Sequence, residues 1–203
     1  MIGNVEGTLK WTGENHSDMT GEWTFTRCTP GDEIVIDRPT AIRTYFDCIH
    51  NSADEIMIIF MGQNGGWQDV ESLIDMHRKM IDHFKGKEYL ILGLSSGSAE
   101  KRSDYETAMK KAFGRRFVSL REYLATPIYD KNGNIVSCYG LADQGLEPGT
   151  AEYKGRTYVA LEEIAVGTVP HQLLQDDVHY TEGTKKVIGE MLYRKMQELN
   201  ILP

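Results

Sequence analysis

The chain has 203 residues, of which 40% are hydrophobic and 26% are charged, so it holds enough apolar material for one domain with a real core. Its formal net charge is −8, from 22 Lys and Arg against 30 Asp and Glu, and it has no basic run, which argues against nucleic acid or an anionic membrane as a partner. No apolar stretch approaches the roughly 20 residues that span a bilayer, and the N-terminus lacks the features of a secretion signal. By default we expect a cytoplasmic protein.

The first part of the chain is predicted to be rich in β-structure. Residues 1–46 contain short alternating runs, EWTFTR at 22–27 and EIVIDRP at 33–39, separated by turn residues. We therefore expect a β-rich N-terminal segment over residues 1–46, followed by a second domain over residues 47–203.

The pattern of this second domain predicts alternating strands and helices. An apolar run, EIMIIFMG at 55–62, precedes an amphipathic helix at 69–84, and EYLILGL at 88–94 precedes a helix-like segment at 103–113. A third short strand begins RRFVSLREYLA at 115–125. Apolar strands that alternate with amphipathic helices predict a parallel sheet covered on both faces, which is an α/β fold.

The alternation of strands and helices is then interrupted before the last helix. Residues 127–175 form an excursion with an Asn-Gly hairpin signal in YDKNGNIVSCYG and a glycine-rich loop stretch. The final segment, from Thr181 to about Leu199, is amphipathic and has Thr181 or Thr184 as its cap.

A glycine- and asparagine-rich turn follows the first apolar run. Gly62–Trp67 reads GQNGGW, so Gly62 offers an exposed backbone N–H and Asn64 a neutral carboxamide donor, the parts of an oxyanion hole. Gly65 and Trp67 beside them are candidates for substrate binding, with the indole as a stacking surface. The alternatives are a plain loop connection and ordinary packing of the tryptophan.

Serines follow the second apolar run. Ser95, Ser96 and Ser98 lie just before a helix, where a serine is usually a cap. A nucleophilic role for one of them requires that it lie close to a catalytic histidine. We interpret these serines as structural.

The strongest chemical pattern is an acid three residues before a histidine. Asp176 can reach the ring N–H of His179 if the loop turns like a helical coil, and it would then orient that ring as a general base. Asp177 ranks second, and the alternative is that Asp176 caps the final helix. A metal site would need His171 as a third ligand at an unusual spacing, so we expect no metal and no cofactor.

These segments resemble a known family. IIFMGQNGGW at 58–67 and DDVHYTEGTKKVIG at 176–189 are similar to two of the four sequence blocks of the SGNH hydrolases, the GDSL-like lipases and esterases. Gly62 and Asn64 match the third block, with Gly65 where the family usually has Asp, and Asp176 and His179 match the fourth. The resemblance covers about residues 20–200 and implies a flavodoxin-like three-layer α/β/α fold.

The resemblance also implies a function and a missing part. It implies a serine esterase that acts on small acyl esters, including acetylated carbohydrate, but the chain has no Gly-Asp-Ser nucleophile block, which in the family precedes the strand at 55–61. We therefore expect the serine to lie outside this chain. Because the fold would then lack its central strand, we expect homo-oligomerisation or association with a missing N-terminal fragment. The alternative is an inactive carbohydrate-binding or scaffold module.

Overall fold

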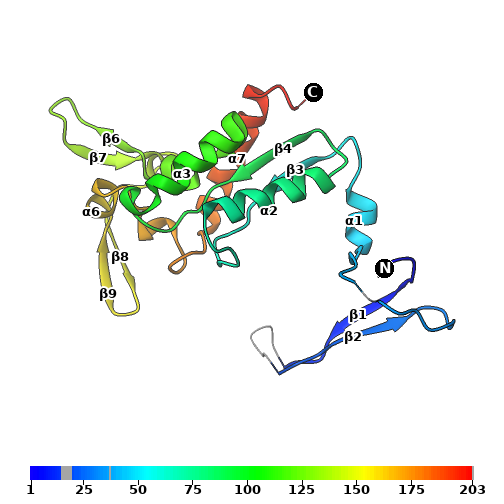
Figure 1. The fold of residues 1–203 in the computed structure, drawn as a ribbon. Coiled ribbons are helices and arrows are strands. Elements are labelled where there is room, and N and C mark those ends of the chain that lie inside the picture. Colours follow the sequence, from blue (N-terminus) through cyan, green and yellow to red (C-terminus); the bar gives the residue numbers. More distant parts are fainter. Residues whose placement is uncertain (15–19, 37, 203) are drawn as a thin grey trace. The chain divides into compact units, whose positions relative to one another are not determined.

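The computed structural model describes residues 1–14, 20–36 and 38–202 (Figure 1). The chain divides into two compact units, Met1–Glu55 and Ile56–Pro203. The sequence placed this boundary after residue 46, a position that falls inside a short helix, α1 (Tyr45–His50). No helix in the described ranges is long and apolar enough to cross a membrane.

The first unit contains one β-hairpin. Its strands β1 (Gly7–Trp11) and β2 (Trp23–Arg27) pair antiparallel, and their ends bring Trp11 opposite Trp23 with ring centroids 5.4 Å apart. Cross-strand aromatic pairs of this kind stabilise a hairpin. The expectation of a second strand in EIVIDRP is wrong for residues 33–36, which have no strand partner and are exposed.

The second unit carries the remaining elements. In chain order they are β3 (Ile56–Ile59), α2 (Val70–His83), β4 (Glu88–Leu92), α3 (Ala99–Phe113), η1 (Gly114–Arg116), β5 (Phe117–Val118), α4 (Leu120–Ala125), β6 (Pro127–Tyr129), β7 (Ile135–Cys138), α5 (Tyr139–Ala142), β8 (Thr150–Tyr153), β9 (Arg156–Val159), α6 (Ala160–Ala165), η2 (His171–Leu173) and α7 (Glu182–Glu198).

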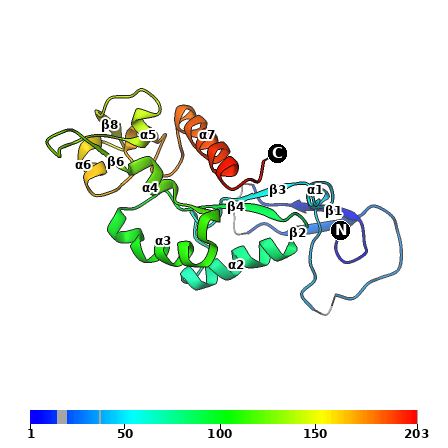
Figure 2. The ribbon, with the colours of Figure 1, turned by 90° about the horizontal axis from the view of Figure 1, so that it is seen from above.

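A three-stranded parallel sheet organises this unit. The strand order is β3-β4-β5, and Ile91 in the middle strand pairs with Ile59 on one side and Phe117 on the other. Figure 2 shows α2 and α3 on one side of the sheet and α7 on the other. The α/β class predicted from the alternating pattern is therefore confirmed, with Leu90 and Ile91 fully buried in the central strand.

The helices on the sheet begin where the sequence provides caps. Asp69 accepts a hydrogen bond from the Ser72 N–H, and the Ser72 hydroxyl accepts one from the Asp69 N–H, which makes a capping box for α2. Ser98 caps α3 by accepting from the Lys101 N–H, as expected for a serine in this position. Thr181, and not Thr184, caps α7.

The excursion forms two antiparallel hairpins and short helices. β6 pairs with β7 around the Asn-Gly turn, and β8 pairs with β9. One apolar cluster joins this region to α4 and α7; its fully buried members include Leu120, Leu124, Leu141 and Leu173. The excursion is thus packed on the carboxyl-terminal half of the unit, next to the loop that holds Asp176 and His179.

Candidate active site

Asp176 and His179 form a hydrogen-bonded pair. The Asp176 Oδ2 atom lies 2.7 Å from Nδ1 of His179, while Oδ1 accepts from the backbone N–H groups of Val178 (2.8 Å) and His179 (2.7 Å). These hydrogen bonds, led by the backbone N–H of His179, hold the pKa of the Asp176 carboxyl well below its usual value. Asp176 is therefore an ionised acceptor that fixes the ring.

The loop that carries this pair is closed on itself. The Gln175 N–H donates to the His179 carbonyl at 2.7 Å, and the Thr181 N–H donates to the Leu173 carbonyl at 3.0 Å. The Thr184 hydroxyl, which is fully buried, also donates to the Leu173 carbonyl. The His179 side chain is 72% exposed, and within the described residues Nε2 forms no hydrogen bond. Nε2 is thus presented to solvent without a protein partner among the described residues.

Asp177 faces a different set of partners from Asp176. One of its carboxylate oxygens accepts from Lys154 Nζ at 3.0 Å, and the other lies 3.7 Å from Nε2 of His171. His171 is bound through Nδ1 to Glu163 at 2.5 Å. The unit Ile56–Pro203 therefore contains another histidine and carboxylate pair besides Asp176 with His179, namely Glu163 with His171. The sequence analysis missed it because the two residues lie eight positions apart across an irregular loop.

The glycine-rich turn after β3 is tight. The Gly65 N–H donates to the Gly62 carbonyl at 3.1 Å, and Gly62 has φ +105°, a conformation that favours glycine. The Gly62 N–H donates to no other described residue, and the Asn64 side chain is exposed without a hydrogen-bond partner there. Both predicted oxyanion donors are therefore free to bind a ligand.

Trp67 is held within the same turn. Its indole N–H donates to the Gly62 carbonyl at 2.8 Å, and its half-buried ring packs against the cluster under α2. This is the packing arrangement weighed in the sequence analysis. Gly65 has φ +82° and open space around it. A substrate-binding role for Trp67 and Gly65 stays a prediction.

The loop after β4 links the turn to the Asp176 loop. The Gln63 carboxamide accepts from the Ser95 N–H (3.2 Å) and donates to the Ser96 hydroxyl (2.7 Å). Burial raises the pKa of Tyr180 to about 12, and the neighbouring Ser95 hydroxyl opposes this shift. Ser95 and Asp177 line one small cavity, so the loop after β4 is also a neighbour of the Asp176 loop. Within the described residues no hydrogen bond joins Asn64 to His179.

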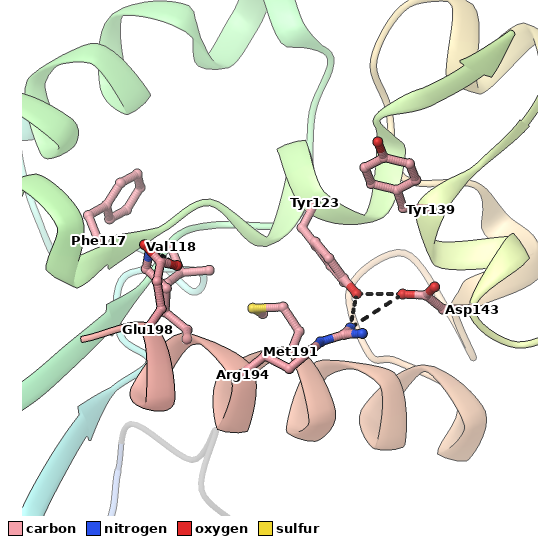
Figure 3. A pocket seen from close by; sticks show the side chains of 9 residues that line it. Phe117, Val118, Tyr123, Tyr139, Asp143, Met191, Arg194 and Glu198 are labelled. Carbon is pink, nitrogen blue, oxygen red and sulfur yellow. Dashed lines mark hydrogen bonds and ion pairs between the residues drawn. The ribbon is translucent and has the colours of Figure 1, made fainter. Parts of the chain in front are cut away.

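A separate hollow contains none of the predicted site residues. It has a volume of about 490 Å³ and is lined by Phe117, Val118, Tyr123, Tyr139, Asp143, Met191, Arg194, Lys195 and Glu198 (Figure 3). Its polar groups are paired with one another: the Tyr123 hydroxyl donates to Asp143 and accepts from Arg194 at 2.7 Å. Burial and then Asp143 raise the pKa of Tyr123 to about 12. This internal pairing leaves few groups for a ligand.

The described residues contain no cluster of three or more His, Cys, Asp or Glu side chains that could hold a metal ion. A scan against protein-family models gave no match, and neither the curated proteins nor the solved structures gave a significant match. The geometry of the loops must therefore carry the functional argument.

Proposed function

We propose that the unit Ile56–Pro203 carries the general-base half of a serine acyl hydrolase of the SGNH type, on a flavodoxin-like three-layer fold. The observation that supports this most directly is the hydrogen bond between Asp176 and Nδ1 of His179, with Nε2 free and exposed. A carboxylate in this position fixes the tautomer of the imidazole and stabilises the imidazolium that forms when Nε2 takes a proton.

The proposed reaction is the cleavage of a small acyl ester, including an acetyl ester on a carbohydrate. A serine from a segment outside this chain attacks the ester carbonyl, and His179 Nε2 accepts the hydroxyl proton. Nε2 then returns that proton to the leaving alcohol, and water releases the acyl group in the same way. The Gly62 N–H and the Asn64 carboxamide donate to the oxyanion.

A second candidate function is a binding module that has kept the fold and lost the reaction. The observation that favours it is that within the described residues no serine hydroxyl is hydrogen-bonded to His179 Nε2. The two candidates differ in whether His179 supports turnover.

The test is hydrolysis of p-nitrophenyl acetate, an activated ester, by the full chain carrying Ser95→Ala. Because the proposed serine lies outside the chain, His179 Nε2 is expected here to activate water directly as a general base. We expect the rate above background to fall about 100-fold, or to background, in His179→Ala, because general-base catalysis typically contributes a factor of this size. Asp176→Asn is expected to lie between the two. His83→Ala, which removes an exposed histidine from α2, is the matched control and should leave the rate of the Ser95→Ala chain unchanged.

Equal hydrolysis by the His179→Ala and His83→Ala variants would refute the acyl hydrolase. Background turnover by the Ser95→Ala chain, combined with calorimetric binding of an acetylated oligosaccharide, would instead support the binding module.

A further inference from the structure

The loop between β4 and α3 contains a pattern that its interpretation as a helix cap does not explain. Gly93–Gly97 reads GLSSG, which fits Gly-x-Ser-x-Gly with Ser95 at its centre. It stands between a strand and a helix, the context in which this pattern presents a nucleophile. A Cβ on Gly93 would lie 2.8 Å from the Phe117 ring, so packing favours glycine there. Gly97 has φ +94°, a backbone conformation that favours glycine.

The Glu163 and His171 pair is largely shielded from solvent. The side chains are 12% and 13% exposed, and Glu163 accepts from both Nδ1 (2.5 Å) and the backbone N–H (2.9 Å) of His171. The imidazole stacks on the Tyr158 ring with centroids 3.5 Å apart. Because Nδ1 faces the Glu163 carboxylate, Nε2 carries the lone pair in the neutral ring. In the described part of the chain this buried atom has no hydrogen-bond partner.

One small cavity brings the serine loop and this histidine together. It has a volume of about 120 Å³, and its lining includes Ser95, Gly97, His171 and Asp177. At roughly 30 Å³ for each water of the liquid, it has room for about four waters or for one small acyl group. Asp177 lies 3.7 Å from Nε2 and would stabilise a positive charge on the ring.

We propose that Ser95, His171 and Glu163 form a second serine-centred site, which lies wholly within this chain and does not depend on His179. His171 Nε2 takes the proton of the Ser95 hydroxyl as Oγ attacks the carbonyl carbon of a small acyl ester. Nε2 gives this proton to the departing alcohol, and an acyl-serine remains until water, activated by the same nitrogen, releases the carboxylic acid.

Two further contacts favour Ser95 over its neighbour. The Ser96 hydroxyl accepts from both Gln63 (2.7 Å) and Arg102 (2.9 Å), so its lone pairs are occupied. Its backbone N–H, like that of Gly97, donates to no other described residue and is available to an oxyanion. In this arrangement Ser96 supplies a backbone donor and Ser95 supplies the nucleophile.

The experiment is intact-mass analysis and peptide mapping of the full chain after treatment with methanesulfonyl fluoride, a reagent small enough for the cavity. Oγ forms a bond to sulfur, fluoride leaves, and His171 takes the proton. We expect a single adduct on Ser95, with a labelling rate at least 100-fold lower in His171→Gln and strongly reduced in Glu163→Gln. Ser98→Ala, which removes only the α3 cap, and His179→Ala should label as the wild type does.

Circular dichroism checks whether each variant is folded. If His171→Gln or Glu163→Gln does not fold, the peptide map of the wild type tests the proposal by itself. An unlabelled Ser95, an adduct on another residue, or a labelling rate unchanged in folded His171→Gln would overturn the proposal. The p-nitrophenyl acetate test of His179 uses a chain that carries Ser95→Ala, so the failure of one site is distinguishable from the failure of the other.

Discussion

The Asp176 carboxylate stabilises the loop that carries it, in addition to orienting the His179 ring. Each of its two oxygens has a separate task, since one accepts from two backbone N–H groups and the other accepts from the His179 ring. The spacing of three residues made this contact predictable from the sequence, because a turn with helical geometry brings positions i and i+3 together. The closing hydrogen bonds between Leu173 and Thr181 were not predictable, since they depend on backbone angles that no side-chain pattern reveals.

The hydrogen bond to Asp176 fixes which nitrogen of His179 is protonated. In the neutral ring we expect Nδ1 to carry the proton and Nε2 to be the acceptor. Two-dimensional ¹⁵N NMR of the histidine side chains should show this tautomer, and Asp176→Ala should remove the preference. A neutral His179 ring protonated at Nε2 would contradict the proposed role of a base.

His77 provides a second prediction at the scale of a residue. It is fully buried in α2, near the Phe113 ring, and neither ring nitrogen has a hydrogen bond within the described residues. Burial lowers its pKa from 6.5, an effect that the Met61 carbonyl partly opposes. The unfolded chain therefore binds this proton more readily, so the stabilising contribution of the neutral ring is complete above pH 6.5 and is lost as the pH falls below it.

We expect His77→Leu to raise the free energy of unfolding by about 1–3 kcal/mol, the cost of leaving polar groups buried and unpaired. It should also flatten the dependence of stability on pH below 6.5, where the wild-type ring loses its stabilising contribution. Urea unfolding at several pH values measures both effects. His83→Leu, at an exposed position of the same helix, should keep the dependence, and an unchanged slope in His77→Leu would show that another group causes it.

At the scale of elements, a buried ion pair ties α3 to α4. Arg121 donates to Glu106 through Nε (2.8 Å) and Nη2 (2.5 Å), and both side chains are about 95% buried. Ser119 donates to the same carboxylate, and Arg121 also donates to the Gly167 carbonyl at 2.7 Å. Three segments, α3, α4 and the turn after α6, therefore meet at the Arg121 guanidinium.

Removing the charge of Glu106 should be costly. We expect Glu106→Gln to lower the free energy of unfolding by about 3–5 kcal/mol, because it leaves the Arg121 guanidinium buried without a counterion. Asp75→Asn, which removes an exposed partner of Arg78, should change it by no more than about 0.5 kcal/mol. Thermal unfolding of the two variants makes the comparison, and equal losses of stability would disprove the importance of burial.

The elements themselves were predicted where the pattern was long and periodic. The helix expected over residues 69–84 begins and ends within one residue of α2, because its capping residues and its apolar face agree. The strand expected in EIVIDRP failed because alternation alone supplies no partner strand. The pairing of Glu163 with His171 depends on where the β8-β9 hairpin places α6, and only Gly93–Gly97 gave a local signal for this second site.

At the scale of the whole molecule, the open edge of β3 is the notable feature of the sheet. β3 has no second neighbour in the described sheet, and Ile58, Phe60 and Met61 are each between 44% and 48% exposed. Unpaired apolar edge strands are templates for association with another chain.

We expect the full chain to self-associate at micromolar concentration, as measured by light scattering after size-exclusion chromatography. Ile58→Lys should shift the distribution toward the monomer, because a charge at the edge disfavours strand pairing. Leu161→Lys on α6, which removes a leucine of similar exposure, is the control and should leave the distribution unchanged. A wild-type chain that is monomeric at all concentrations would rule out this role of the edge.

The closed ring of the Asp176 loop also determines how fast its amides exchange with solvent. The Thr181 N–H bond to Leu173 stands at the start of α7, so opening the ring requires the first turn of that helix to unwind. Amide hydrogen exchange at Thr181 should therefore be about as slow as in the helix that follows. The His179 imidazole therefore belongs to a loop that is already ordered in the folded protein. A ligand that binds it displaces water but does not have to order this loop, so binding avoids that entropic cost.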